Sequence, residues 1–403
     1  MTMNLRRSIT KLIPAPERRY IKSRLSWLMK GKTGKRLQAS LARIETSGPI
    51  DFSKIRAIIH LGDGSRGAHH IYQQWRDVFI SAQVPFVCVI RKTHIFDICR
   101  AQYPKDFFIQ ASNAVAINTV VSMLPDLKVV FYTGNTGNNV HFLAFENIKQ
   151  IFIGHGDSDK GTSSLRMFRV YDEVWVAVQA HIDRISVNSP NVSTRVVGRP
   201  QVKRLIDQTQ DSAFIKNDVC KVVYLPTWEG ATEYFNYSSL DLAYELVKSV
   251  QDIGFQLHVK LHPSTGNRLG ISSKIKEKLE SLCLSGSSLY ESDKNVVDLM
   301  VDADICITDT SSIVSDWLTT KKPIFIYYPK DIHIKVGAQY EDFAYIFSTA
   351  NEFNELLKKV IVEGNDHKKQ AREAISEYLV SSKATRNELF TLALHDVVSD
   401  VDN

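Results

Sequence analysis

The chain has 403 residues, of which 44% are hydrophobic and 23% are charged. That length exceeds what one ordinary hydrophobic core organises and favours two α/β domains. The apolar runs fall short of the roughly 20 residues that a transmembrane helix needs, and the amino terminus lacks the apolar stretch of a secretory signal. Five scattered cysteines show neither metal nor disulfide spacing, which favours buried thiols in a reducing cytoplasm.

The net charge of +6 is unevenly distributed along the chain. Residues 1–43 contain twelve Lys and Arg and one acid, for a charge of +11, whereas the remainder has 38 bases and 43 acids, for a charge of −5. Within the basic segment, Leu5, Ile9, Leu12 and Ile13 follow helical spacing. A basic amphipathic segment suits an anionic membrane surface. The alternative is a solvated arm that docks on the protein itself. Binding to nucleic acid is a third interpretation, and the net negative charge of the remaining chain argues against it.

From residue 55 onward, short apolar runs typical of buried parallel strands alternate with helical patterns. In the first half, a helix is predicted over 68–82, and strands over 55–61, 84–90, 127–133, 148–154, 171–178 and 194–198. Strand signals lapse between Arg199 and Asp211. The second half predicts strands over 220–227, 256–263, 304–309 and 323–328, helices over 238–252, 272–282 and 311–320, and a helix-rich end from Glu352 to Val398.

This alternation predicts an α/β protein with two Rossmann-like domains facing a cleft. We place the basic amphipathic segment at residues 1–45, the N-terminal domain at 46–205, and the C-terminal domain with its terminal helices at 206–403. In open sheets of this kind, ligands bind beyond the carboxyl ends of the strands. Motifs that follow a predicted strand are therefore the candidates for chemistry.

A glycine-rich turn from Gly62 to Gly67 follows the first predicted strand and has the G-x-G-x-x-G spacing of dinucleotide-binding folds. The next strand is followed by Arg91 and Lys92, where an NAD site needs an acid for the ribose hydroxyls. These two bases are compatible with the 2′-phosphate of NADP. A nicotinamide enzyme is therefore one interpretation, and a plain tight turn is the other.

A His-Gly pair, His155 and Gly156, follows the predicted strand over 148–154. An imidazole at the end of a buried strand can take a proton from an attacking hydroxyl near neutral pH. Asp157 or Asp159 can orient the ring, and Lys160 can attract phosphate. The alternative is a polar turn in which the histidine only caps a backbone group.

Two cationic or polar donors end the predicted strand over 256–263. Alternation places Lys260 and His262 on the same face, and Pro263 ends the strand. Such a pair suits a diphosphate. A surface lysine and a histidine packed under a turn are the simpler interpretation.

The predicted strand over 304–309 is followed by hydroxyl side chains that open a helix. The opening residues are Asp309, Thr310, Ser311 and Ser312. Amide N–H groups at a helix start form a ready anion site, although plain N-capping gives the same pattern. Asp316, one turn further, can accept hydrogen bonds from ribose hydroxyls.

An Asp-x-Asp pair, Asp302 and Asp304, resembles a metal-binding motif. It precedes its strand and therefore falls at the opposite edge of the sheet from the other motifs, so we interpret it as a solvated loop. The chain has no Cys/His cluster with zinc spacing. We expect neither a metal nor a cofactor.

Four motifs, in this order, resemble those of the CDP-glycerol glycerophosphotransferase family, which includes teichoic-acid primases and polymerases and related capsule enzymes. The resemblance covers roughly residues 151–329. The motifs are His155, Gly156 and Lys160; Pro226, Thr227 and Trp228; His262 and Pro263; and Thr308, Asp309, Ser311, Ser312 and Asp316. Each motif alone is weak, but four in the right order are specific.

Three positions depart from the family pattern. Glu229 stands where the family commonly has an arginine, Thr310 where it has an aromatic residue, and Gln201 where an arginine follows Pro200. The glycerol-specific contacts are thus open to change. Another CDP-polyol, or a nucleotide sugar, is open as the donor.

The resemblance implies a GT-B-like fold without a metal, in an enzyme on the cytoplasmic face of the cell membrane. An acceptor hydroxyl on a membrane-linked polymer or glycan would attack the β-phosphate of a CDP-polyol and release CMP. His155 would be the general base, with His262 and Asp157 as further catalytic residues. The remaining site residues would be Lys160, Pro226, Thr227, Trp228, Lys260, Asp309, Thr310, Ser311, Ser312 and Asp316 for the nucleotide and phosphates, and Gly64, Ser65 and Arg66 on the acceptor side.

Two alternatives compete with this interpretation. A GT-B glycosyltransferase for capsule or lipopolysaccharide synthesis would use the same anion site but direct the attack at carbon. A membrane-docked scaffold with a degenerate site would need none of these side chains, and the intact set of His155, His262, Ser311 and Ser312 argues against it.

Overall fold

The computed structural model describes residues 44–64, 67–156, 165–209, 219–230, 232–233, 236–266, 277, 279–281, 288–290, 295–329, 340–380 and 387–399. The described chain divides into two compact units. The first falls within residues 1–155, 170–175 and 391–403, and the second within 156–169 and 176–390. The segment predicted to bind a membrane lies outside the described residues, apart from Ile44 and Glu45.

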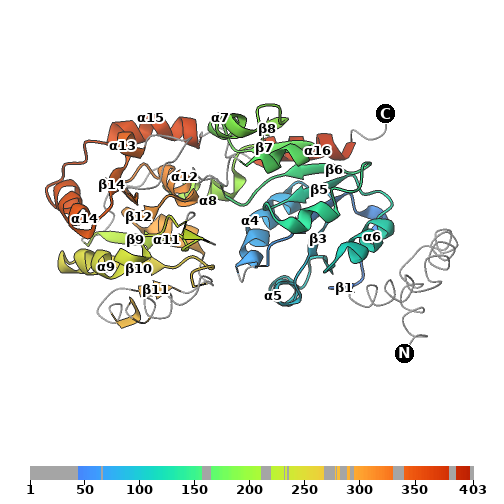
Figure 1. Cartoon of the computed structure of the whole chain (residues 1–403), viewed down its shortest axis with the longest axis horizontal. Helices are drawn as coiled ribbons and strands as arrows, with labels where there is room; N and C mark the ends of the chain where they lie inside the picture. The colour runs from blue at the N-terminus through green and yellow to red at the C-terminus, as the bar shows by residue number, and fades with distance from the viewer. Residues whose placement is uncertain are drawn as a thin grey trace. The chain divides into compact units, whose positions relative to one another are not determined.

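The first sheet has eight strands in the order β1-β4-β3-β2-β5-β6-β7-β8 (Figure 1). Strands β2 to β7 pair in parallel, and β1 runs antiparallel to β4. The strands are β1 (Glu45–Thr46), β2 (Ala57–Leu61), β3 (Phe86–Ile90), β4 (Phe108–Gln110), β5 (Val129–Tyr132), β6 (Lys149–Phe152), β7 (Glu173–Val176) and β8 (Thr194–Val196). The strands β2 and β5 are buried at every residue, as expected for parallel strands covered on both faces.

Helices cover this sheet because each presents one apolar stripe to it. The helix α4 (Ala68–Ser81) buries Ile71, Tyr72, Trp75, Val78 and Phe79 at helical spacing, while residues 73–74 and 76–77 between them are polar. The other connecting helices are α5 (Thr93–Gln102), α6 (Ala114–Met123) and the short 3₁₀ turns η2 (Gly137–His141) and η4 (Arg166–Val170). The chain returns to the first unit at its end, within α16 (Asn387–Ser399).

The second sheet has six parallel strands in the order β11-β10-β9-β12-β13-β14. They are β9 (Lys221–Leu225), β10 (Gln256–Lys260), β11 (Ser288–Tyr290), β12 (Ile305–Asp309), β13 (Ile324–Tyr327) and β14 (Tyr345–Phe347). The helical elements of this unit are α7 (Gln179–Asn188), η5 (Pro200–Val202), α8 (Lys203–Thr209), η7 (Leu240–Leu242), α9 (Ala243–Asp252), α11 (Val296–Asp302), α12 (Ser312–Leu318), α13 (Tyr340–Phe343), α14 (Ala350–Leu357), the π-helical turn η8 (Lys358–Val362) and α15 (Lys369–Leu379).

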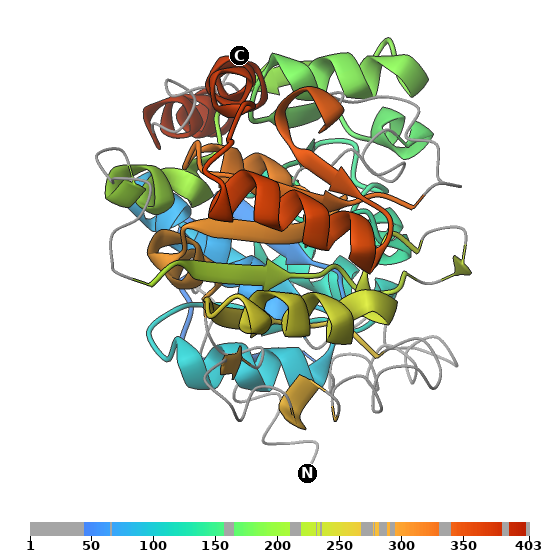
Figure 2. The ribbon, with the colours of Figure 1, turned by 90° about the vertical axis from the view of Figure 1, so that its left-hand side faces the viewer.

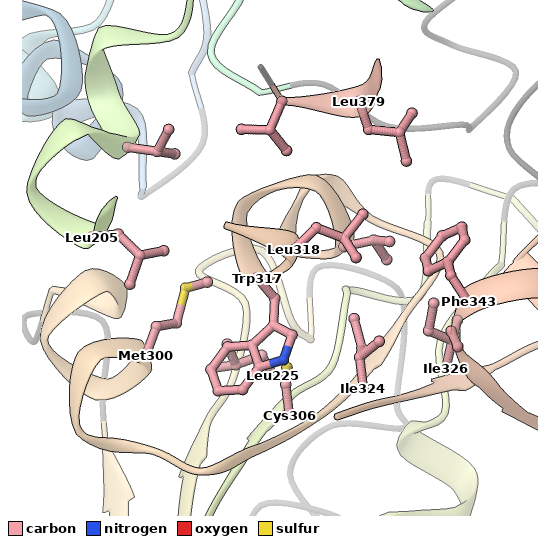
Figure 3. Close-up of a cluster of buried hydrophobic side chains, with 14 of the residues drawn as sticks. Leu205, Leu225, Met300, Cys306, Trp317, Leu318, Ile324, Ile326, Phe343 and Leu379 are labelled. Carbon is pink, nitrogen blue, oxygen red and sulfur yellow. The ribbon is translucent and has the colours of Figure 1, made fainter. Parts of the chain in front are cut away.

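Successive side chains along the strands of the second sheet point to opposite faces and pack into two separate hydrophobic cores. On one face, Val222 and Tyr224 pack with α9 and α14, and Figure 2 shows these two helices lying over the sheet. On the other face, Val223 and Leu225 pack with α8, α11, α12 and α15. Trp317 lies near the middle of this second core, beside Met300 and Ile324 (Figure 3). This double burial explains why β9 reads as a continuous apolar run.

The predicted α/β class with two largely parallel sheets is confirmed, with a few local corrections. The short strands β4, β11 and β14 were not predicted; β8 has the same length but lies within the longer predicted run over 194–198. The interpretation of Asp304 as part of a solvated loop is wrong. Its carboxylate is buried and accepts the backbone N–H of Lys221 at 3.0 Å, so it anchors the start of β9.

Both sheets share one strand order, and that order positions their ligand sites. In each sheet the chain builds outward from a central strand in one direction and then resumes on the other side of that strand. The reversal falls between β2 and β5 in the first sheet and between β9 and β12 in the second. Open sheets bind ligands at this switch point, beyond the carboxyl ends of the strands. Within the described part of the chain, no helix has the length and apolar character needed to cross a membrane.

Candidate functional site

The switch point of the second sheet is held together by Asp309, the last residue of β12. Its side chain is fully buried, and one carboxylate oxygen accepts the backbone N–H of Thr227 at 2.6 Å. The other accepts the backbone N–H of Ser239 at 3.2 Å. One carboxylate therefore fixes the loop of Pro226, Thr227 and Trp228 against the end of β12. This geometry assigns Asp309 to positioning that loop.

Hydroxyl side chains line the start of α12. The Ser311 hydroxyl accepts the backbone N–H of Ile313 at 3.3 Å, which makes Ser311 the N-cap of the helix. It also lies 3.4 Å from the Thr308 hydroxyl, which donates to the Leu225 carbonyl. Thr310 is fully buried, and its hydroxyl has no hydrogen-bond partner among the described residues. The side chain of Ser312 is partly exposed, which leaves it as the hydroxyl available at this edge.

The glycine after His155 makes a close contact with this helix start. A Cβ atom built on Gly156 would lie 3.0 Å from the Ser312 hydroxyl oxygen and 3.1 Å from its Cβ. Such distances are tighter than a side chain normally tolerates, so glycine lets the backbone approach Ser312. Gly156 thus lies directly against Ser312.

His262 lies beside the aromatic side chain of Trp228. The ring centroids are 6.5 Å apart with an interplanar angle of 22°. The His262 Nδ1 atom accepts the backbone N–H of Ser264 at 3.0 Å, so Nδ1 carries a lone pair and the ring proton resides on Nε2. His262 therefore presents an N–H donor, which suits a phosphate oxygen.

Glu229 connects the two loops that carry Trp228 and His262. It is buried, and its Oε1 atom accepts the backbone N–H of Gly266 at 2.7 Å. At this position the family commonly has an arginine, so the chain replaces a cation with a carboxylate that closes the loop after β10. Lys260, at the end of β10, is also largely buried. The sequence pattern did not predict the hydrogen bond by which Glu229 connects these two loops.

Asp316, in α12, forms an ion pair with Arg199. Its Oδ1 atom lies 2.7 Å from Nη2 of Arg199, and both side chains are mostly buried. Arg199 stands two residues before Gln201, the position where the family has an arginine. Any contact between Asp316 and ribose would involve the second oxygen or a rearranged pair, because Arg199 already engages Oδ1.

His155 belongs to the first unit and follows β6. Gly154 turns the chain with a φ of 63°, a conformation that favours glycine, and its carbonyl accepts the indole N–H of Trp75 at 2.8 Å. The His155 Nδ1 atom lies 2.5 Å from the carbonyl oxygen of Thr133. Since a carbonyl only accepts, Nδ1 carries the proton, and Nε2 holds the lone pair. The ring is exposed and presents an acceptor that can receive a proton.

A buried amide supports the backbone on which His155 rests. Nδ2 of Asn139 donates to the Gly134 carbonyl at 2.8 Å and to the Tyr171 hydroxyl at 2.8 Å. The Tyr171 hydroxyl donates in turn to Oδ1 of Asn135 at 2.9 Å. Gly134 lies against the His155 ring, at 3.5 Å from Nδ1 to the position of an added Cβ. The network therefore fixes the Thr133–Gly134 backbone that orients the imidazole.

Several predicted residues lie outside the described part of the chain. These are Asp157 and Lys160 near His155, and Ser65 and Arg66 in the first glycine turn. Gly64 is described and lies next to the side chain of Lys92. Among the described residues, no group of three or more His, Cys, Asp and Glu side chains is arranged to hold a metal ion.

Two units with largely parallel sheets and Rossmann-type strand order are typical of the GT-B-like fold. The family model described as CDP-Glycerol:Poly(glycerophosphate) glycerophosphotransferase matches residues 159–386. The chain belongs to this family and is a CDP-glycerol glycerophosphotransferase-like transferase. No curated protein sequence matches the chain significantly.

Solved structures similar to this chain share its fold at low identity. The wall teichoic acid polymerase TagF matches with a TM-score of 0.60 and 14% identity, covering 97% of this chain and 100% of its own. A glycosyltransferase from Rickettsia africae matches with a TM-score of 0.54 and 11% identity, covering 86% and 98%. HepE from Anabaena, in complex with UDP and glucose, matches with a TM-score of 0.53 and 10% identity, covering 84% and 100%. These matches identify the fold alone.

Proposed function

We propose that the protein transfers glycerol phosphate, or a closely related polyol phosphate, from a CDP-activated donor to a hydroxyl of a cell-surface polymer. An oxygen–phosphorus bond forms between the acceptor hydroxyl and the β-phosphorus of the donor. The bond from that phosphorus to CMP breaks, and CMP leaves. The observation that carries the proposal is the pair of histidines with opposite hydrogen-bonding roles in a chain of this family.

His155 is the general base in this proposal. Its Nδ1 proton is committed to the Thr133 carbonyl, so Nε2 is the atom that takes the proton of the attacking hydroxyl. The resulting imidazolium is stabilised by the same carbonyl, which then accepts from a more strongly polarised N–H. Asp157, which lies outside the described residues, is a further candidate for assisting this step.

The donor is held at the switch point of the second sheet. His262 donates from Nε2 to a phosphate oxygen, and Ser312 adds a hydroxyl from the start of α12. Lys260, and Lys160 outside the described residues, supply positive charge, while Trp228 borders the base. Asp309 and Thr310 act through the backbone they hold, and Asp316 lies on the ribose side. No divalent metal takes part, because these protein donors neutralise the charge on the leaving phosphate.

The natural acceptor in this proposal is a membrane-linked teichoic-acid or capsule polymer, and the enzyme works at the inner face of the cell membrane. Residues 1–43 would attach the chain to anionic lipid through their +11 charge and apolar spacing. Co-sedimentation with anionic vesicles should fall sharply on deletion of residues 1–43 and weaken as salt rises. Equal sedimentation of the truncated chain would exclude this role.

Release of nucleotide from a panel of donors tests the activity. Purified full chain with a glycerophosphate oligomer should release CMP from CDP-glycerol in EDTA, and little UDP from UDP-sugars. Because Glu229, Thr310 and Gln201 depart from the family pattern, CDP-ribitol belongs in the panel. Release of UDP but no CMP would replace the proposal with a glycosyltransferase, and release of neither would reject both.

A further inference from the structure

The switch point of the first sheet contains a buried cation that the proposed chemistry does not use. Arg91 directly follows β3, and only 2% of its surface is exposed. Its Nη2 atom lies 2.6 Å from Nδ1 of His141 and 3.4 Å from the Ser112 carbonyl. Its Nε and Nη1 atoms are buried with no hydrogen-bond partner among the described residues. Buried guanidinium groups normally have their donors satisfied and their charge paired.

No acidic side chain among the described residues forms an ion pair with Arg91. Burial lowers the pKa of Arg91 to about 10, so the group stays charged at neutral pH. Burial, and then the charge of Arg91, lowers the pKa of nearby His60 to about 3, so His60 is neutral. The pKa of His141 is also lowered, by burial and by Arg91. The cluster therefore carries one uncompensated positive charge.

The side chains near Arg91 are a hydrogen-bond donor, His141, and a second cation, Lys92. His141 accepts from Arg91 at Nδ1, so its ring proton is on Nε2 and its partly exposed ring presents a donor. Lys92 is exposed, and its stem runs along the backbone at Gly64, where an added Cβ would lie 2.9 Å from Cε. The glycine turn itself is held by Asn138, whose Nδ2 atom donates to the Gly62 carbonyl at 3.0 Å. All of these groups follow β2, β3 or β5, at the edge where such sheets bind ligands.

We infer that Arg91, His141 and Lys92 form a phosphate-binding subsite in the first unit. The ligand is a phosphate monoester or diester. Its role rests on the proposed function: the subsite binds a phosphodiester of the acceptor polymer, one polymer repeat away from the attacking hydroxyl. Nε and Nη1 of Arg91 lack hydrogen-bond partners among the described residues, and a guanidinium N–H forms a strong, charge-assisted hydrogen bond to a phosphate oxygen. The loop from Thr133 to His141 carries both His141 and the carbonyl that orients His155.

The test uses the full chain with ¹³C-labelled histidine rings, so that His141 reports on its own surroundings. The signal of His141, assigned with His141→Gln, should shift and saturate as inorganic phosphate is added at constant pH and ionic strength in EDTA. A glycerol phosphodiester should give the same shift at lower concentration, and CMP should not. In Arg91→Met the phosphate affinity should fall about 10- to 100-fold, as expected for loss of a charge-assisted hydrogen bond.

Two further variants keep the result interpretable. Arg56→Met removes a partly exposed arginine of the same unit that pairs with Asp126 at 3.1 Å, and it should leave the His141 response unchanged. If thermal melting shows that Arg91→Met does not fold, Lys92→Gln replaces it, because that side chain is exposed and its loss should weaken phosphate binding. A His141 signal that ignores both phosphate and the diester, or that responds equally in the folded Arg91→Met or Lys92→Gln, would overturn the subsite.

The competing sources of phosphate give different outcomes. If CDP-glycerol shifts His141 as strongly as the diester, the subsite takes the donor, and its assignment to the acceptor is wrong. Absence of CMP release would reject the proposed function while the titration still decides whether the anion subsite exists. If transfer occurs, Arg91→Met should raise the KM for a phosphodiester acceptor about tenfold or more while the Kd for CMP stays unchanged.

Discussion

The two sheets of this protein share a strand order but carry opposite chemistry at their switch points. In the second unit, the carboxylate of Asp309 joins β9 to β12, and the imidazole of His262 presents a donor. In the first unit, the switch point carries Arg91 without a paired acid, and the imidazole of His155 presents an acceptor. Strand order thus determines where ligands bind, whereas the backbone partner of each side chain decides what it can do there.

The two histidines make this contrast concrete. Both lie beyond the end of a parallel strand, and both use Nδ1 for a backbone hydrogen bond. The partner of His155 is a carbonyl oxygen, which forces the proton onto Nδ1. The partner of His262 is an N–H group, which forces the proton onto Nε2. One ring can therefore receive a proton at Nε2, and the other can donate there.

Replacing His155 should have the largest effect on the reaction. His155→Ala should lower turnover by ~10²–10⁴, the range for loss of a general base, while the Kd for CMP stays close to wild type. His155→Gln should be as inactive, because an amide cannot take the proton. Steady-state CMP release and calorimetry measure the two quantities. Turnover within about threefold of wild type would remove His155 as the base.

His262 should respond differently to the same pair of substitutions. His262→Ala should weaken donor binding by about 10- to 100-fold, the value for a hydrogen bond to a charged group, and should lower turnover as well. His262→Gln should recover part of the loss, since its amide can present an N–H near the position of Nε2. Calorimetry with CDP-glycerol measures the recovery. Equal loss in the two variants would mean that His262 does not act as a donor.

The two serines at the start of α12 separate ligand binding from folding. Ser312→Ala should weaken CMP binding in EDTA by about 1–3 kcal/mol, without much change in unfolding free energy. Ser311→Ala should instead lower the unfolding free energy by about 1 kcal/mol, because it removes the N-cap. Calorimetry and chemical denaturation distinguish the two effects. If CMP bound only in the presence of a divalent metal, the metal-free donor site would be wrong.

The sequence predicted the frame of both units because their buried parallel strands are continuous apolar runs. Ten strands, β2, β3, β5 to β10, β12 and β13, fall on predicted runs, whereas β4, β11 and β14, of three residues each, were not predicted. The predicted motifs follow these strands, so their place at the carboxyl edge came from alternation alone. Hydrogen-bond partners could not be predicted in this way, since they depend on loops that meet only after folding.

Three residues illustrate that limit. Glu229 was noted only as a departure from the family pattern, yet its carboxylate closes the loop after β10. Arg199 was noted only as the start of the stretch where strand signals lapse, yet it pairs with Asp316. Arg91 was considered for the phosphate of NADP because it follows β3, and burial without an acidic partner is what gives it a new interpretation.

The smallest expected effects come from two buried tyrosine hydroxyls, one in each unit. The Tyr171 hydroxyl accepts from Asn139 and so supports the backbone under His155, while the Tyr224 hydroxyl lies 2.8 Å from that of Ser239, whose N–H binds Asp309. Tyr171→Phe removes two neutral hydrogen bonds and Tyr224→Phe removes one, and each bond contributes about 0.5–1.5 kcal/mol to the unfolding free energy. Both variants should melt below wild type, and Tyr171→Phe should melt at the lower temperature.

The two variants should affect different steps of the reaction. Tyr171→Phe loosens the support of the Thr133 carbonyl, so it should lower kcat a few-fold while the Kd for CMP is unchanged. Tyr224→Phe loosens the loop that Asp309 holds, so it should raise the Kd for CMP a few-fold while kcat at saturating donor changes little. Each variant serves as a control for the other, because both lose stability but only one loses each function. A uniform loss of kcat and CMP affinity in both would mean that the hydroxyls stabilise the fold only, and that the division of labour between the two switch points does not extend to their supporting residues.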